Sequence, residues 1–243
     1  MAVLTTRAKP VHSSGPAVAV PVLENGDRLT RAEFERRYVA MPDLKKAELI
    51  EGEVYVGSPV RHRRHSVPHS QINGWLSVYV AGTPGVVAGD NGSIRLDLDN
   101  EPQPDVYLMI EPEQDGQARI SADDYVEGAP ELVAEIAASS VSYDLGNKLQ
   151  AYRRNGVREY IIWRVEDRAV DWFVLREGRY ETLAPAADGT LRSTVFPGLW
   201  LDPAALLRGD LATVLALVQQ GLSSTEHADF VNRLHRAESP GPR

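Results

Sequence analysis

The sequence contains no cysteine among its 243 residues. Disulfide bonds, thiolate zinc sites and cysteine nucleophiles are therefore excluded, and any metal must be held by oxygen or imidazole ligands. Long apolar runs are missing as well. No stretch approaches the length of a membrane span, and Arg7, Lys9 and Pro10 interrupt the region that a signal peptide would need to keep apolar. We therefore expect a cytoplasmic protein.

Positive charge is scarce. The chain has 26 Lys and Arg residues against 34 Asp and Glu, a formal net charge of -8. Because contacts to phosphate need Lys and Arg, this balance argues against a general nucleic-acid coat protein. It leaves room for an enzyme that binds nucleic acid in a local basic groove.

The hydrophobic content of 43% is enough for one good-sized core, and we expect a single domain over residues 29–206. Residues 1–28 show no period of 2 or 3.6 and are predicted to be a mostly disordered leader. Residues 207–243 are predicted to be a C-terminal helical extension and tail, because apolar residues recur there at helical spacing.

The order of local patterns predicts an α/β (α+β) fold. A capping box at Thr30 starts a short helix, and AELIEGEVYVG follows as a β-hairpin. After a helix over residues 68–80, three β-rich runs up to residue 110 have the pattern of a meander. The strand PELVAEIA, a helix over residues 143–155 and the strand REYIIWRV form a parallel crossover, to which antiparallel strands are added. The expected core is a mixed β-sheet flanked by helices.

Three charged residues stand out from this framework. Asp105 follows a proline and opens a strand, although an isolated Pro-Asp is usually a turn with a solvated carboxylate. Glu135 lies inside the apolar run LVAEIA, where an ionised carboxylate is costly to bury unless it is paired or bound to a metal; a strand-end position in water is the alternative. Lys148 shares a helix stripe with Asp144 and Tyr152, and taken alone it is an ordinary surface lysine.

The order of Asp105, Glu135 and a following lysine resembles the PD-(D/E)XK superfamily of restriction-endonuclease-like nucleases. More narrowly, the chain is similar to the Uma-type endonuclease family over about residues 29–206. The segments that carry this resemblance are AELIEGEVYV, the His69-Ser70 helix start, PDVYLM, EGAPELVAEI, the D-x-x-x-K-x-x-x-Y of Asp144, Lys148 and Tyr152, NGVREYIIW and FPGLWLD. The resemblance implies a restriction-endonuclease-like fold and a homodimer.

The resemblance also implies the metal site. One or two Mg²⁺ ions, or Mn²⁺, would be bound by Asp105 and Glu135, with the backbone carbonyl of Ile136 as a further oxygen ligand. The superfamily lysine would stand two residues after Glu135, where this sequence has Ala137. Lys148 on the following helix is therefore the candidate that orients the nucleophile or stabilises the transition state, as the family pattern also suggests.

Three further residues are candidates with an equal structural alternative. Glu48 is either a metal carboxylate or partner of Lys148, or a solvent-facing strand residue. His69 either contacts a phosphate or orients a carboxylate, or it packs or caps at its helix start. Tyr152 either supports Lys148 or packs in the core.

The basic run Arg61-His62-Arg63-Arg64-His65 precedes His69 and would lie near the mouth of the site. Arg61, Arg63 and Arg64 are expected to meet a phosphate backbone there; a mobile charged loop is the alternative. No aromatic residue is interleaved with the run, so it indicates no sequence or single-strand preference.

These features predict a metal-dependent endonuclease that hydrolyses phosphodiester bonds in nucleic acid, with DNA as the expected substrate. Two alternatives stay open. The first is a catalytically silent dimeric binding or regulatory module on the same fold, favoured by the acidic net charge and the missing in-strand lysine. The second is a hydrolase of small phosphate esters, for which the basic run has little use.

Overall fold

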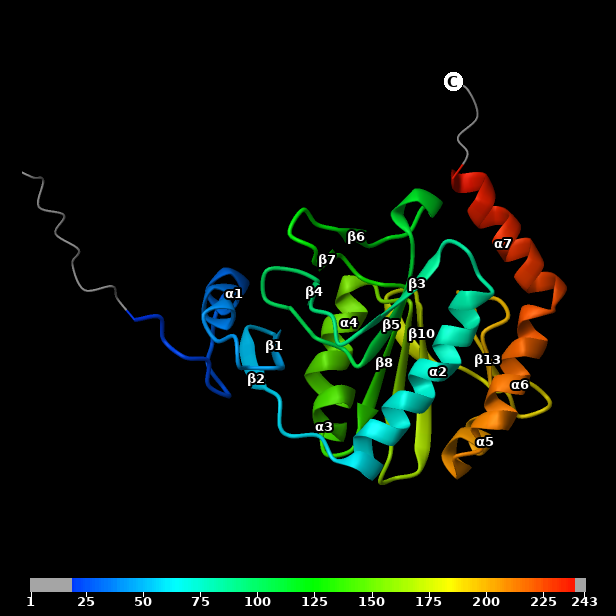
Figure 1. Cartoon of the computed structure of the whole chain (residues 1–243), viewed down its shortest axis with the longest axis horizontal. Coiled ribbons are helices and arrows are strands. Elements are labelled where there is room, and N and C mark those ends of the chain that lie inside the picture. Colours follow the sequence, from blue (N-terminus) through cyan, green and yellow to red (C-terminus); the bar gives the residue numbers. More distant parts are fainter. Residues whose placement is uncertain (1–18, 239–243) are drawn as a thin grey trace, which may run out of the picture.

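The computed structural model describes residues 19–238 and is built around a six-stranded sheet (Figure 1). The strand order is β11-β10-β9-β8-β5-β3. These strands are β3 Val86–Asp90, β5 Val106–Ile110, β8 Leu132–Ala137, β9 Glu159–Arg164, β10 Ala169–Arg176 and β11 Arg179–Thr182. β8 and β9 are parallel and the other neighbours are antiparallel, so the predicted crossover and the mixed sheet are confirmed.

Helices cover both faces of this sheet. They are α2 Val67–Ala81, α3 Val141–Tyr143, α4 Leu149–Asn155, α5 Pro203–Arg208, α6 Leu211–Leu222 and α7 Thr225–Glu238. The remaining helix, α1 Arg31–Val39, packs against a hairpin beside the sheet. Successive strand residues point to opposite faces. On one face Leu108 and Ala134 pack with α2 and the C-terminal helices; on the other, Tyr107 and Val133 pack with Tyr152 of α4. Odd-numbered residues of β5 and β8 therefore face α4.

A separate hairpin lies to one side of the sheet, at the left of Figure 1. It consists of β1 Ala47–Ile50 and β2 Glu53–Val56, with α1 packed against it. Thr30 accepts a hydrogen bond from the Glu33 amide at the start of α1, as the capping box predicted. The hairpin, α1 and Leu23 share a third small core.

The predicted leader needs a correction. Residues 1–18 lie outside the described residues, but Leu23 is only 5% exposed and the Gly26 amide donates to the Val54 carbonyl at 2.9 Å. The packed structure therefore begins before Leu29, because this segment supplies part of the cover of the hairpin core.

The predicted meander is wrong in its pairing. β3 pairs directly with β5, and the run between them contributes only β4, Ile94–Arg95. β4 instead joins a small sheet of order β4-β7-β6, with β6 Arg119–Ile120 and β7 Val126–Glu127. A short 3₁₀ turn, Pro112–Gln114, and the pair β12 Leu191–Arg192 and β13 Trp200–Leu201 complete the strands and turns outside the site.

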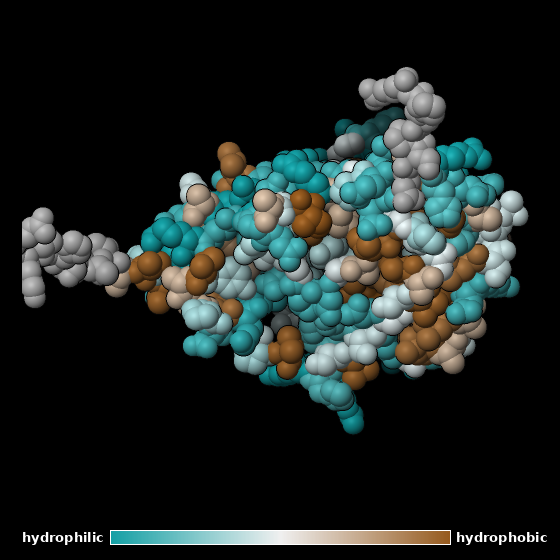
Figure 2. All heavy atoms as spheres, turned by 45° about the horizontal axis from the view of Figure 1, so that its top comes forward, coloured by the Kyte–Doolittle hydropathy of each residue, from teal (hydrophilic) through white to brown (hydrophobic). Residues whose placement is uncertain are grey.

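The C-terminal helices belong to the main core. Val214, Val218 and Phe230 pack with α2 and the sheet, so the segment predicted as an extension is part of the domain as far as residue 238. Figure 2 shows a mostly hydrophilic face, with hydrophobic residues gathered toward the side that carries these helices. Within the described part of the chain, no helix has the length and apolar character to cross a membrane.

Candidate active site

Asp105 and Glu135 meet on neighbouring strands. The β5–β8 register aligns Val106 with Ala134, and one residue further along it Asp105 stands opposite Glu135 on the face toward α4. The Asp105 amide donates to Glu135 Oε2 at 3.4 Å, and the Ile136 amide donates to Asp105 Oδ2 at 2.8 Å. Each residue is 3% exposed. The solvated alternatives for both carboxylates are therefore wrong.

Lys148 reaches Glu135 from the segment after β8. That segment is a broken helix of α3, the wide turn η3 (Asp144–Lys148) and α4, interrupted where Gly146 takes a non-helical φ of -102° and ψ of -111°. Lys148 Nζ lies 2.7 Å from Glu135 Oε1 and 2.7 Å from Glu48 Oε1, and the side chain is 2% exposed. Lys148 is thus no surface lysine. It brings an ammonium group next to Glu135, where the superfamily lysine would stand if position 137 were not a buried alanine.

Two other predicted residues join this buried group. Glu48 Oε1 accepts a hydrogen bond from the Gln103 amide at 2.7 Å as well as the contact from Lys148, so Glu48 is a partner of the lysine and not a solvent-facing strand residue. The Tyr152 hydroxyl donates to Glu135 Oε1 at 3.0 Å. The tyrosine therefore fixes the glutamate directly, in addition to packing in the core.

Two basic side chains to which the sequence assigned no individual role contact Asp105. Lys46 Nζ and His65 Nε2 each lie 3.2 Å from Asp105 Oδ1. Lys46 is two residues before Glu48, and strand alternation was the available signal that the two share a face. His65 lies in the wide turn η1, His62–Ser66, which leads into α2. Such wide turns are rare and recur at functional sites, and here both η1 and η3 supply site residues.

His69 contacts the backbone of Asp105 rather than the carboxyl group of Asp105 or of Glu135. Its Nε2 lies 3.0 Å from the Asp105 carbonyl oxygen and 3.0 Å from Asp90 Oδ1. His69 therefore ties α2 to the start of β5 and supports Asp105 from behind.

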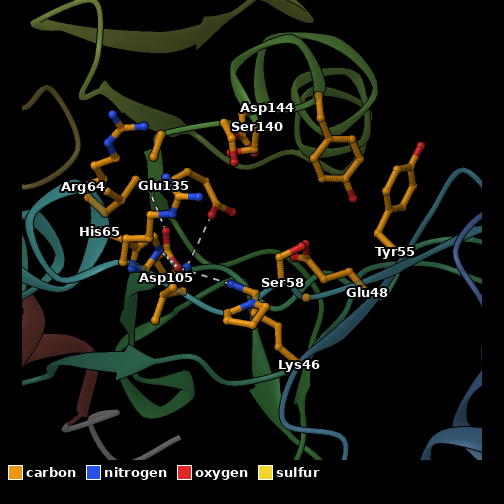
Figure 3. Close-up of a pocket in the computed structure, with 18 of the residues that line it drawn as sticks. Lys46, Glu48, Tyr55, Ser58, Arg64, His65, Asp105, Glu135, Ser140 and Asp144 are labelled. Atoms are coloured by element: carbon orange, nitrogen blue, oxygen red, sulfur yellow. Dashed lines mark hydrogen bonds and ion pairs between the residues drawn. The ribbon is translucent and has the colours of Figure 1, made fainter.

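A cavity of about 440 Å³ lies between the hairpin and the sheet, and its lining includes Lys46, Glu48, His65, Asp105, Glu135 and Lys148. His69 and Tyr152 lie behind this lining. Figure 3 shows Glu48, Asp105 and Glu135 around it, with Lys46 pointing toward Asp105 from the hairpin side. Arg61 and Arg64 of the basic run line the cavity, whereas Arg63 does not. The run is a helical turn at the cavity and not a mobile loop, and Arg64 pairs with Glu166 at 3.1 Å.

The cavity also has an aromatic wall. Tyr55 of β2 and Tyr143 of α3 line it, with ring centroids 4.2 Å apart. This wall was not predicted, because the two tyrosines lie on distant elements of the chain and meet only when the hairpin packs beside α3.

The charges of the site differ in how firmly they are fixed. Burial raises the pKa of Glu135 to about 8, with Lys148 opposing and Asp105 adding to the rise. Burial would also raise the pKa of Asp105, but the hydrogen bond from His65 and the charge of Lys46 outweigh it and hold that pKa well below its usual range. Burial would lower the pKa of Lys148, but Glu135 and Glu48 raise it well above its usual value. Asp105 is therefore ionised and Lys148 protonated at neutral pH.

The donor set fits a hard divalent cation. Asp105 and Glu135 offer carboxylate oxygens next to the Ile136 backbone, in a cavity that also has room for water. Within residues 19–238 no group of three or more His, Cys, Asp or Glu residues is placed to hold a metal. Mg²⁺ is commonly held by one or two carboxylates together with water and substrate phosphate. The residues thus fit such an ion and not an all-protein cage.

The comparison with protein families decides the family. The model of the Uma2 family, described as "Putative restriction endonuclease", matches residues 31–204. The chain belongs to the Uma2 family. The match runs from α1 into α5 and includes every site residue named above. The predicted resemblance is therefore confirmed, and the chain is a member of a nuclease family.

A solved structure supports the fold. The crystal structure of "a putative nuclease belonging to DUF820" from Anabaena variabilis matches with a TM-score of 0.50 and 15% sequence identity, over 71% of this chain and 97% of that chain. At this identity the likeness concerns the fold alone, and it confirms the predicted restriction-endonuclease-like class. No curated protein matches the chain.

Proposed function

We propose that the chain is a metal-dependent endonuclease that hydrolyses phosphodiester bonds in nucleic acid. One observation carries the proposal: two buried carboxylates, Asp105 and Glu135, stand opposite each other at a cavity and each contacts a lysine. A lone pair of buried acids would be costly, and a site that binds a cation accounts for their proximity.

The site residues have different roles in this reaction. Asp105 and Glu135, with the Ile136 carbonyl, would hold Mg²⁺ or Mn²⁺. When bound, the ion would supply Lewis acidity at the phosphate and favour the ionisation of water. Lys148 and Tyr152 fix the Glu135 carboxylate through contacts of 2.7 and 3.0 Å. Lys148 is thus a positioning residue.

The groups around the cavity receive the substrate. Arg61 and Arg64 lie at the cavity and attract the phosphate backbone of the strand. DNA as the substrate and a homodimer as the assembly remain part of this proposal, since both come from the family resemblance.

The silent binding module is the weaker candidate, because Lys148 supplies from the helix the charge that the strand lacks at Ala137. The small-ester hydrolase explains the acids equally well but gives no role to Arg61 and Arg64. A substrate panel that includes a nucleotide and a simple phosphodiester separates it from the nuclease.

The test is cleavage of labelled DNA and RNA by the purified protein with Mg²⁺ or Mn²⁺. We expect cleavage that stops when the metal is chelated. Asp105→Ala and Glu135→Ala should each lower the rate by about 100-fold or more, the size expected for losing a group that stabilises transition-state charge. Glu226→Ala, which removes an exposed acid of α7, is the matched control. Absence of cleavage, or cleavage by both site variants at the parent rate, contradicts the proposal.

A further inference from the structure

The site contains two lysines, and they differ in what they can reach. We propose that Lys46, and not Lys148, is the lysine that binds the phosphate backbone of the nucleic-acid strand. The inference rests on the proposed nuclease function and names the residue that holds the substrate at that site.

Lys148 has no free capacity for a phosphate. Its ammonium group is 2.7 Å from two carboxylates, Glu48 and Glu135, and its side chain is 2% exposed. Two carboxyl groups therefore already surround one ammonium group. To reach a phosphate, Lys148 would have to leave these buried contacts.

Lys46 has this capacity. Its side chain is 27% exposed, and its one carboxylate contact, at 3.2 Å, is Asp105, which His65 also contacts. The contact of Lys46 with Asp105 is longer than the contacts of Lys148, and His65 also contacts that carboxylate. The ammonium group of Lys46 can therefore turn to a phosphate at little cost in free energy.

The position of Lys46 points to the backbone of a strand. A second hollow of about 730 Å³ adjoins the first, and Lys46, His65 and the segment 57–60 line both. The lining of the second hollow includes Ser70, Asn73 and Asn91. Hydroxyl and amide groups of this kind bind sugar and phosphate oxygens. A strand that occupies both hollows must pass Lys46, whereas a strand in the first hollow alone need not.

The test is metal-free binding, which is independent of cleavage. Fluorescence anisotropy of a labelled oligonucleotide in EDTA, at several salt concentrations, gives the affinity and its salt dependence. Lys46→Ala and Lys46→Gln should bind about tenfold more weakly, and the slope of log K against log salt should fall by about 0.7 to 0.9, the share of one phosphate contact. Lys46→Arg should keep most of the affinity. Arg179→Ala removes one exposed positive charge from the edge strand β11, so it is the charge-matched control and should bind like the parent.

An indirect effect through Asp105 must be separated from contact. Removing Lys46 also leaves Asp105 less neutralised, which alone would repel a strand. In an Asp105→Asn background, Lys46→Ala should still weaken binding and lower the salt slope. If the Lys46 variants bind like Arg179→Ala, or if the effect vanishes in the Asp105→Asn background, the inference is overturned while a cleaving parent keeps the nuclease function. A parent that neither binds nor cleaves nucleic acid overturns both.

Discussion

Replacing Lys148 by methionine tests the buried ion group at the centre of the site. Methionine keeps an unbranched apolar stem and removes the ammonium that lies 2.7 Å from both Glu48 and Glu135. Breaking a buried pair by removing one partner costs about 3 to 5 kcal/mol, because the remaining charge stays buried without compensation. Two carboxylates lose their shared cation here, so we expect a loss in unfolding free energy of about 5 kcal/mol at pH 9.

The loss should depend on pH. Burial raises the pKa of Glu135 from 4.5 to about 8, and Lys148 opposes the rise, so the variant should raise it further. For a carboxyl with a raised folded-state pKa, the stabilising contribution is complete below the unfolded value and is lost as pH rises through the folded value. Below about pH 8 Glu135 is protonated in both folded proteins, so the difference in unfolding free energy between them should be constant there. Above pH 8 only the folded parent ionises Glu135, and the variant should fall further below it, by up to about 1.4 kcal/mol per pH unit.

Urea unfolding of both proteins at pH 5, 7 and 9 measures this difference. Lys45→Met makes the same substitution at an exposed lysine just before the hairpin, and it is the control. Adding Glu135→Gln to Lys148→Met removes one of the two carboxylates and should recover about 2 kcal/mol at pH 9. A Lys148→Met protein as stable as the parent at pH 9, or equally destabilised at every pH, refutes the reasoning.

Three further variants test other parts of the structure. Burial raises the pKa of Glu101 to about 8, so between about pH 5 and 8 the parent should lose about 1.4 kcal/mol of unfolding free energy per pH unit through this group. Glu101→Gln should remove that slope, and an unchanged slope contradicts the assignment. Gly221→Ala should cost about 1 to 3 kcal/mol, because its Cβ would lie 2.1 Å from the Gly198 carbonyl oxygen; an unchanged melting temperature would disprove this packing of α6. Tyr152→Phe removes the 3.0 Å hydrogen bond to Glu135 and should cost about 1 kcal/mol and lower kcat more than substrate affinity; equal kcat would speak against the positioning role.

A local pattern was enough to single out Glu135, whereas Asp105 was selected by its context in the family resemblance. Glu135 lies in a continuous apolar run, and such a run is typical of a strand that is buried on both faces of a sheet. The cost of burying the charge of Glu135 could therefore be predicted from the sequence. The strand, helix and strand that follow are joined by short connections, which made the parallel crossover predictable as well.

The rest depended on contacts between distant segments. Whether β3 pairs with β4 or with β5 is decided by the packing of both faces of the sheet, and the local turn at Asn91 could not indicate it. Lys46 was missed for the same reason. It lies 3.2 Å from a carboxylate that belongs to another element, and this contact exists only when the hairpin is docked on the sheet. The sequence predicted that Lys148 lies on a helix. It did not predict that the side chain is buried, because its partner Glu48 lies on the distant hairpin.

The contact between Glu48 and Lys148 also sets an order of events during synthesis of the chain. The two residues are about 100 residues apart in the sequence. At about 5 to 20 residues per second, Glu48 is made roughly 5 to 20 s before Lys148. The acid of the hairpin stays without its buried cation during this interval, and β8 follows long after the hairpin as well. A nascent chain therefore carries no complete site until the turn that holds Lys148 has emerged.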